Sequence, residues 1–379
     1  MACKIAGRAD NGRTGILAMV TQEVEILSPI QTFWLMTLDV VILNWNGRKL
    51  LEILLPRVAE RSAVKGVTLV LADNGSDDDS VEWVKTNMPD VKIIELGQNY
   101  GFADGYNRAL ALLESDYCLL LNSDVEPAEN WLPPLIRVMD ENSEVAAVTP
   151  KIKDYNNRQY FEYAGAAGGY IDKLGYTFCR GRIFDNVEED RGQYDTPSKV
   201  FWGSGAALLV RRKLFLDSGG FDSHFIAHME EVDWCWRIKN RGYEILYEPS
   251  SEVYHMGGGS LNYGNPRKTY LNFRNNLFLI LKNQYGTKAW LIIAARFVID
   301  FVALLNFFFK GEGLHAAAIS KAHRNFLKDA GRYKAIRKQL MRSVIARQHP
   351  EQYRGSVVLD YFLKGKKEFK MLRFKPDPK

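Results

Sequence analysis

Short apolar runs alternate with segments of helical pattern along the first 150 residues. The apolar runs, rich in Val, Ile and Leu, cover 38–43, 67–72, 91–96, 117–121 and 145–149. The predicted helices lie between them, at 49–58, 80–88, 106–113 and 131–140. Continuous apolar runs are typical of strands buried on both faces. Their alternation with helices predicts an α/β fold with a doubly wound, mostly parallel sheet.

Polar clusters follow these runs at the points where the predicted strands end. They cover 44–47, 73–79, 98–107 and 122–126. Sheets of this class bind ligands just beyond the carboxyl ends of their strands. The pattern therefore predicts one site, built from several loops at one edge of one sheet.

Beyond residue 150 the strict alternation stops. We expect a long loop or small hairpin over 161–194, a strand over 201–210, a short helix over 212–218, a helix over 230–240 and a strand over 243–247. The last third of the chain is helical in pattern.

Residues 290–309 form a strongly apolar segment whose length approaches the roughly 20 residues that span a bilayer. The segment contains Arg296 and Asp300, which are four positions apart and can pair on one helix face. A charge at mid-bilayer costs at least about 2.5–3.5 kcal/mol. We therefore favour a helix at the membrane surface or buried in the protein over a true span.

The net charge of +5 is unevenly distributed. Residues 311–379 hold 17 Lys and Arg against 6 Asp and Glu, a net charge of +11, so the other 310 residues carry −6. A basic region of this kind is typical of a solvated helical surface, a nucleic-acid arm or a contact with anionic lipid. Because no nucleic-acid-binding motif accompanies it, we expect no nucleic-acid partner.

Composition indicates a globular protein of a reducing, cytoplasmic setting. Hydrophobic residues make up 46% and charged residues 25% of the chain, near globular averages. The four cysteines are scattered without a CxxC pair, which favours neither a disulfide framework nor a Cys-rich zinc site. Residues 1–36 carry no recognisable secretory signal. We expect them to be a poorly ordered extension, with a structured N-terminal element as the alternative.

Two acidic residues directly follow predicted strands. Asp124, in the sequence Asn122-Ser123-Asp124, suits a Mg²⁺ or Mn²⁺ ion on a diphosphate, because these ions prefer oxygen ligands and share them with phosphates. A turn or helix cap before Pro127 is the alternative. Asp73 suits a hydrogen bond from a nucleotide base or ribose, whereas capping explains the later acids of its loop.

Three carboxylates, Glu230, Glu231 and Asp233, lie at the start of a predicted helix. The helix dipole alone favours acids there, but partial burial beside tryptophans would also raise a carboxyl pKa toward the range of a general base. His255, between a strand and three glycines, is either a metal ligand or a packed residue. Gly101 opens a helix whose N-terminus favours anions, although the GxGxxG fingerprint is absent.

Seven motifs in this order resemble the family 2 glycosyltransferases, and most of all the branch with rhamnosyltransferase-like enzymes of bacterial surface-polysaccharide assembly. The motifs are VVILNWNG, LADNGSDDDS, QNYGFADGYN, LLLNSDVEP, FWGSGAALLVRR, GGFDSHFIAHMEEVDWCWRIKNRGY and YHMGGGS. The resemblance implies a GT-A fold, which is Rossmann-like and mostly parallel, and an inverting mechanism. We expect the catalytic domain over 37–283 and a helical, basic, membrane-associated C-terminal region over 284–379.

The resemblance also implies roles for individual residues. Asp73 would contact the base, and the nucleotide-sugar cleft would also include Asn44, Asn46, Asn99, Gly101, Asn107 and Asn122. Asn122-Ser123-Asp124 stands in place of the family's DxD motif, so Asp124 would be the main acidic metal ligand and His255 the second. Glu231 would be the general base, with Glu230 and Asp233 left open as alternatives. The acceptor would be bordered by Trp202 and Gly203, and a pyrophosphate-lipid acceptor would be contacted by Arg267, Arg274 and Asn275.

The predicted function is transfer of a sugar from a dTDP-, UDP- or GDP-sugar to a saccharide or a polyprenyl-diphosphate-linked saccharide. The reaction would need Mg²⁺ or Mn²⁺ and would take place at the inner leaflet of the membrane, with the protein peripheral on its cytoplasmic face. Two alternatives stay open. One is a catalytically silent nucleotide- or carbohydrate-binding scaffold. The other is a sugar nucleotidyltransferase, against which the lack of a Gly-rich, basic triphosphate loop after the first strand counts.

Overall fold

The computed structural model describes residues 36–257 and 264–374. The expected N-terminal extension over 1–36 lies outside the described residues, except for its last position.

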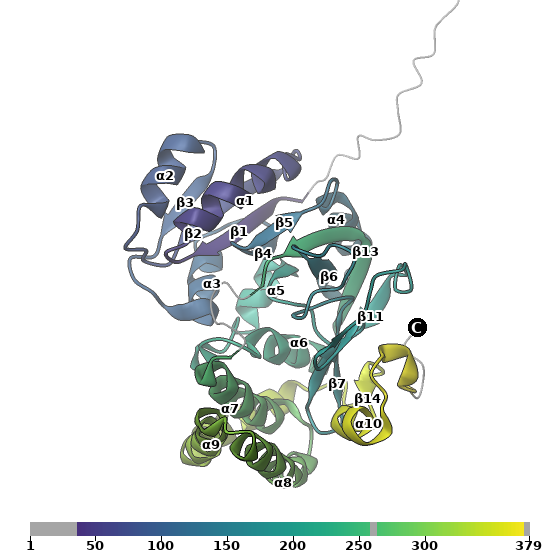
Figure 1. The fold of residues 1–379 in the computed structure, drawn as a ribbon. Coiled ribbons are helices and arrows are strands. Elements are labelled where there is room, and N and C mark those ends of the chain that lie inside the picture. Colours follow the sequence, from purple (N-terminus) through teal and green to yellow (C-terminus); the bar gives the residue numbers. More distant parts are fainter. Residues whose placement is uncertain (1–35, 258–263, 375–379) are drawn as a thin grey trace, which may run out of the picture. The chain divides into compact units, whose positions relative to one another are not determined.

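Nine strands of the described chain form the central sheet (Figure 1). They are β1 (Leu38–Asn44), β2 (Val67–Asp73), β3 (Lys92–Glu95), β4 (Tyr117–Asn122), β5 (Val125–Pro127), β6 (Val145–Asp154), β11 (Ser198–Val200), β12 (Ala207–Arg211) and β13 (Glu244–His255). The order is β11-β13-β6-β12-β4-β1-β2-β3, and β5 pairs with β13. The parallel members are β3, β2, β1, β4, β6 and β13, with β12 running antiparallel between β4 and β6. The predicted mostly parallel α/β sheet is confirmed.

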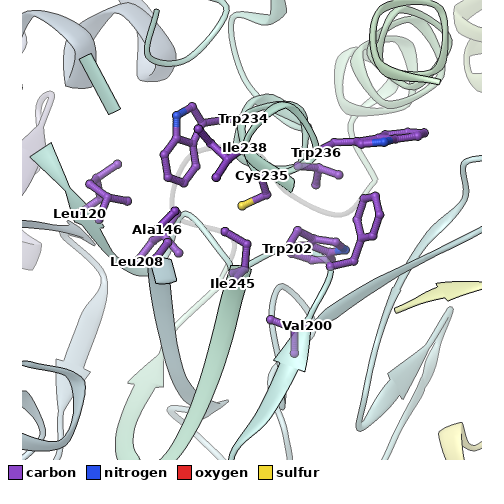
Figure 2. Packing of buried hydrophobic residues seen from close by; sticks show 14 of the residues in the cluster. Leu120, Ala146, Val200, Trp202, Leu208, Trp234, Cys235, Trp236, Ile238 and Ile245 are labelled. Atoms are coloured by element: carbon purple, nitrogen blue, oxygen red, sulfur yellow. The ribbon is translucent and has the colours of Figure 1, made fainter. Parts of the chain in front are cut away.

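Six helices flank this sheet: α1 (Arg48–Arg61), α2 (Ser80–Asn87), α3 (Gly101–Ala111), α4 (Leu132–Glu141), α5 (Arg212–Asp217) and α6 (Glu230–Asn240). Side chains of α3, α5 and α6 share one buried core with β1, β4, β6 and β12. Figure 2 shows part of it, where Trp234, Cys235 and Ile238 of α6 cover Leu120, Ala146, Leu208 and Ile245 of four strands. Helix α4 packs against β6 and β13.

The strand expected over 201–210 is confirmed only in its second half, because β12 covers Ala207–Arg211. Residues 201–206 connect it to β11, which ends at Val200 and pairs with β13, whereas β12 pairs with β4 and β6. The residues between them contain Gly203 and Gly205, which lie against Thr149 and Phe102 respectively, so closely that a Cβ would be crowded. The apolar run was continuous, but its glycines allow the chain to leave one strand position and enter another.

A second sheet of the described chain contains β7 (Gly169–Asp172), β8 (Thr177–Cys179), β9 (Arg182–Ile183), β10 (Asn186–Val187) and β14 (Gln352–Tyr353), in the order β10-β9-β8-β7-β14. Its first four strands lie where a loop or hairpin was expected. The fifth comes from the C-terminal region and runs parallel to β7. The Val357 N–H, which begins the helix after β14, donates to Asp172 at 2.9 Å. The end of the described chain therefore returns to a strand near the middle of the sequence.

Three long helices follow the central sheet: α7 (Pro266–Asn283), α8 (Lys288–Phe309) and α9 (Gly313–Leu340). They pack side by side (Figure 1) and share an apolar cluster that includes Phe278, Ile293 and Phe326. A shorter helix, α10 (Val357–Lys364), lies after β14, and single-turn 3₁₀ helices cover Ser223–Phe225, Met341–Ser343 and Phe369–Met371.

Candidate active site

The carboxyl ends of β1 and β2 carry a connected hydrogen-bond network. In the strand register Asn44 lies opposite Asp73, and both are buried. The Asn44 amide donates to Asp73 Oδ1 at 3.0 Å, and the Ser76 hydroxyl donates to the same oxygen at 2.6 Å. The Ser76 N–H donates to Asp73 Oδ2 at 3.0 Å. The carboxylate is thus oriented by three donors before any ligand is present.

Neighbouring loops extend this network to the start of α3. The Asn74 amide donates to Asn99 Oδ1 at 3.2 Å, and the Gly101 N–H donates to that oxygen at 2.8 Å. The Asn46 side chain accepts from the Asp77 N–H at 2.7 Å. Gly75 has a φ of +74° and lies so close to Gln98 that a Cβ added to Gly75 would be 2.4 Å from the Cα of Gln98. The structure therefore brings together the predicted residues Asn44, Asn46, Asp73, Asn99 and Gly101.

Asp124 and His255 lie beside each other although 131 positions separate them. Asp124 directly precedes β5, and β5 pairs with the end of β13, where His255 is the last residue. His255 Nε2 is 3.1 Å from Asp124 Oδ1. On the other edge of the ring, His255 Nδ1 is 3.3 Å from Glu162 Oε2. All three side chains are buried.

This trio suits a divalent cation with two protein ligands. The two carboxylates contact opposite nitrogens of one imidazole, so they do not face a common point. Accordingly, no three His, Cys, Asp or Glu side chains of the described chain are arranged to share an ion. A carboxylate and an imidazole nitrogen are both suitable donors for Mn²⁺, and diphosphate oxygens complete such a shell in nucleotide sites.

The charge balance of the trio also fits a cation. Burial alone would lower the pKa of His255, but its contacts with Asp124 and Glu162 outweigh burial and raise the pKa to about 10. Two buried carboxylates thus hold a positive charge between them. The same field would stabilise a metal ion at this position.

Glu230 and Glu231 form a second acidic group, at the N-terminus of α6. Among the described residues neither Glu230 Oε2 nor Glu231 Oε2 has a hydrogen-bond partner. Burial raises the pKa of Glu231 to about 7. Burial and the charge of Glu231 raise the pKa of Glu230 well above its usual value. At neutral pH this group is therefore poised to exchange a proton.

The loop before α6 is strained and is held from α7. Ile226, His228 and Met229 all have φ between 67° and 74°, which non-glycine residues rarely adopt. The Asn275 side-chain amide donates to three backbone carbonyls of this loop, those of Phe225, Ala227 and His228, at 2.8–3.0 Å. Arg274 donates to the His224 carbonyl at 2.7 Å.

These contacts differ from the role expected for Arg274 and Asn275, which was contact with a pyrophosphate-lipid acceptor. Both side chains are buried and their donors bind protein carbonyls, so they hold the loop rather than present a surface to an acceptor. Arg267, at the start of α7, is exposed, and its contact with an acceptor stays a prediction.

Asp233, the third acid of α6, is fully buried and fully paired. Its carboxylate accepts from Arg237 at 2.8 Å, from Lys282 at 2.8 Å and from Asn283 at 2.7 Å. Both of its oxygens are occupied by these donors, so it has no free oxygen for an acceptor hydroxyl. Its contacts favour a structural role and leave Glu230 and Glu231 as the stronger candidates for the base.

Three other predicted residues lie in packed surroundings. The Asn107 amide exchanges two hydrogen bonds of 2.8 Å with the Phe221 backbone. The Trp202 indole donates to the Tyr170 carbonyl at 2.9 Å and lies in the same buried cluster as Cys235 and Trp236 (Figure 2). Gly203 is also buried. Their contacts with a donor or acceptor stay predictions.

A cleft of about 330 Å³ opens beside Glu162 and is lined in part by Tyr163, Met256 and Gly257. Burial raises the pKa of the Cys179 thiol, on β8, to about 12, and the charges of Glu162 and Glu231 act weakly in the same direction. Both carboxylates are therefore within electrostatic reach of this thiol.

Sequence reasoning missed Glu162, Asn74 and Ser76. The last two were quoted within the 73–79 cluster but given no separate role, although their position at a strand end was a usable signal. Glu162 lies in a Gly- and Tyr-rich stretch without periodicity, and no local pattern distinguishes it from a surface acid.

A family model and the related proteins both point to glycosyltransferases. Residues 39–217 match the model of glycosyl transferase family 2. An N-acetylglucosaminyl-diphospho-decaprenol L-rhamnosyltransferase of Mycobacterium tuberculosis is 30% identical over 206 residues, which cover 50% of this chain and 66% of that protein. The match thus spans slightly less than two thirds of the relative. The family model ends before Glu230, Glu231 and His255, whose roles rest on geometry.

Two solved structures share the fold. Staphylococcus aureus TarS, residues 1–349 with UDP-GlcNAc, superposes with a TM-score of 0.52 at 17% identity, over 81% of this chain and 87% of that one. GalNAc-T7 with UDP, GalNAc and Mn²⁺ also gives a TM-score of 0.52, at 20% identity, over 65% of this chain and 48% of that one. The expected GT-A fold is confirmed.

Proposed function

Because the chain belongs to glycosyl transferase family 2 and is a glycosyltransferase, we propose the following mechanism for it. It moves a sugar from a nucleoside-diphosphate sugar to a hydroxyl of a saccharide and inverts the anomeric configuration. The nucleotide lies against the Asp73 network, Asp124 and His255 hold a divalent cation, and Glu231 is the general base. The observation that carries this proposal is the 3.1 Å contact between Asp124 and His255 at the nucleotide edge of the sheet.

A Mg²⁺ or Mn²⁺ ion would supply positive charge against the departing nucleoside diphosphate. Asp124 and His255 Nε2 would be its protein ligands. Glu162 faces His255 Nδ1 and would accept the proton of that nitrogen. With the Nε2 proton replaced by the ion, this contact would favour the tautomer whose Nε2 lone pair faces the ion, as carboxylates behind metal-bound histidines do.

Glu231 supplies the base because its pKa of about 7 leaves it partly ionised at neutral pH and able to take a proton. The acceptor oxygen attacks the anomeric carbon from the face opposite the diphosphate. As the new carbon–oxygen bond forms, the bond to the diphosphate oxygen breaks and the hydroxyl proton passes to the Glu231 carboxylate. The products are the inverted glycoside and a nucleoside diphosphate.

The acceptor we propose is a saccharide carried on a polyprenyl diphosphate, at the cytoplasmic face of the membrane with the protein peripheral. The relative from M. tuberculosis is named for a decaprenyl-diphosphate-linked GlcNAc acceptor and an L-rhamnosyl donor group. One helix of the described chain, α8, is long and apolar enough to cross a membrane by length and composition. The donor is a dTDP-, UDP- or GDP-sugar.

A donor screen tests this function. The protein is incubated with a panel of nucleotide sugars, Mn²⁺ or Mg²⁺, and a polyprenyl-diphosphate saccharide. We expect release of nucleoside diphosphate with one donor class, and no release after chelation. Release of pyrophosphate would identify a nucleotidyltransferase instead. Nucleotide binding without turnover across the whole panel would identify a silent scaffold and contradict the proposal.

A further inference from the structure

Helix α8 has one apolar face that no described residue covers. Leu291, Val298, Phe301, Val302, Phe308 and Phe309 form this face, here called the α8 face. Their exposed fractions run from 55% for Phe301 to 80% for Phe309. The spacing of three, four and seven positions places them on one stripe of the helix. A contiguous apolar surface of this kind marks a docking site.

The opposite side of α8 is charged, buried and bound to three other elements. Arg296 donates to Asp300 at 3.2 Å and contacts Asn276 of α7. Asp300 also accepts from Tyr176 at 3.1 Å and lies 3.1 Å from His323 of α9. The Arg296 guanidinium stacks over the Tyr176 ring at 3.7 Å. The segment's two charges are thus satisfied inside the protein.

These contacts fix how α8 can meet a bilayer. A spanning α8 would have to leave α7, α9 and the β7–β8 turn, and Arg296 and Asp300 would lose their contacts with Asn276, Tyr176 and His323. A docked α8 keeps every one of those contacts and inserts only the α8 face. The arrangement therefore favours a helix lying in the plane of the membrane interface.

Cations surround the α8 face. Lys288 and Lys310 are exposed at the two ends of the helix. Lys334 of α9 lies 5.7 Å from the ring of Trp290, at the N-terminal end of the stripe. These three side chains complement anionic headgroups. They lie in or beside the basic part of the chain, since residues 311–379 carry a net charge of +11.

We propose that the α8 face docks in the headgroup region of an anionic bilayer, with α8 parallel to the membrane plane. Adjacent residues of α7 connect this surface to the candidate base. Asn276 contacts Arg296, whereas Asn275 holds the loop that precedes Glu230 and Glu231. One helix thus separates the docked surface from the acceptor side of the site. Docking itself does not depend on the proposed function, but its use in presenting a lipid-linked acceptor does.

Vesicle flotation tests docking. The full chain is mixed with vesicles of phosphatidylcholine alone or with one third phosphatidylglycerol. We expect flotation with the anionic vesicles and its loss at high salt. The double variant Val298→Glu, Phe301→Glu should bind at least about tenfold more weakly, because it replaces two apolar side chains of the docking face by charged ones. Leu112→Glu is the matched control, since Leu112 is 62% exposed on another element and should leave flotation intact.

Helix orientation is tested separately. Nitroxide labels are placed singly at 291, 301 and 309 in a Cys3→Ser background, since the other three cysteines are buried. An in-plane helix gives equal, shallow depths at all three positions. A deep central label with shallow ends would show a span and overturn the proposal.

Other outcomes separate docking from function. A chain that dimerises through the α8 face and ignores vesicles would overturn docking while leaving the proposed function intact. A chain that floats but releases no nucleoside diphosphate would support docking and contradict the function. The double variant should keep its turnover on a water-soluble acceptor and lose turnover on the lipid-linked one.

Discussion

Two groups of buried acids in this molecule have opposite electrostatic surroundings. Asp124 and Glu162 lie on either side of His255, whose pKa they raise to about 10 against the effect of burial. Glu230 and Glu231 lie together at a helix N-terminus, and the Oε2 atom of each has no hydrogen-bond partner in the part of the chain that the structure describes. Burial raises the pKa of Glu231 to about 7.

The difference shows how one fold assigns two tasks to the same chemical group. Carboxylates that already share a positive charge are suited to a metal ion. Carboxylates that are buried without compensation are suited to accept a proton. The variants below alter one group while the other serves as the internal control.

Asp124→Ala should have the largest effect. We expect turnover to fall about 10³-fold, because the variant removes an acidic ligand that stabilises charge in the transition state by several kcal/mol. Mn²⁺ affinity, measured by electron paramagnetic resonance, should fall with it. Unchanged Mn²⁺ affinity in this variant would place the cation elsewhere.

Glu231→Gln should lower turnover about 10²-fold or more while leaving Mn²⁺ affinity unchanged, because it removes a general base and no metal ligand. The same variant should be more stable than wild type above pH 7 by about 1–3 kcal/mol, because one pKa unit corresponds to about 1.4 kcal/mol. Ionising a carboxyl whose folded pKa is raised destabilises the fold progressively from its unfolded pKa up to about 7. Near pH 4 the two proteins should therefore unfold alike in guanidinium.

The pH dependence of wild-type turnover follows from the same group. With Glu231 as base, kcat/KM should rise with pH until about 7 and then level off, since the carboxyl must be ionised. The charge of Glu231 acts on Glu230 of the same helix and on the buried thiols of Cys179 and Cys235. Loss of this rise in Glu231→Asp, rather than its displacement, would argue against the assignment.

Glu162→Ala should weaken Mn²⁺ binding about 10- to 100-fold, the usual range for a residue that orients a metal-bound histidine. Glu162→Gln keeps an acceptor oxygen for His255 Nδ1 and should recover most of the affinity. Equal losses in both variants would mean that the charge of Glu162, and not its hydrogen bond, matters. Neither variant should alter the pH at which Glu231 ionises by more than a small amount.

Asn275→Ala should have the smallest effect on chemistry, about tenfold in turnover, because it acts only through the loop before α6. It leaves three backbone carbonyls without their donor, each worth about 1–3 kcal/mol when buried. Hydrogen exchange should increase over 225–230 and stay unchanged around Asp124. Slower turnover without local exchange would contradict a positioning role.

The sequence predicted what depends on local pattern. The alternation of apolar runs and helices gave the parallel sheet, and polar residues at strand ends gave the nucleotide edge around Asp73. The pairing of Asp124 with His255 came from a resemblance, because no local signal joins positions 131 apart. Three other features arise from contacts between distant segments, which hydrophobic periodicity does not encode. They are the contact of Glu162 with His255, the hydrogen bonds from Asn275 to the loop before α6, and the pairing of β14 with β7.

The 201–210 segment also shows that a local pattern does not predict contacts between distant segments. The segment was expected to form one strand, whereas only its second half does so, as β12. An apolar composition does not say where a strand begins or which neighbours it has. Gly203 and Gly205 decide that by permitting close packing against Thr149 and Phe102.

A crystal structure with Mn²⁺ and a nucleoside diphosphate tests the central claim most directly. The account predicts the ion about 2.1 Å from an Asp124 oxygen and from His255 Nε2, bridging to the diphosphate, with the Glu231 carboxylate facing the same cleft. An ion bound to other residues, or a Glu231 carboxylate directed away from the nucleotide, would contradict it.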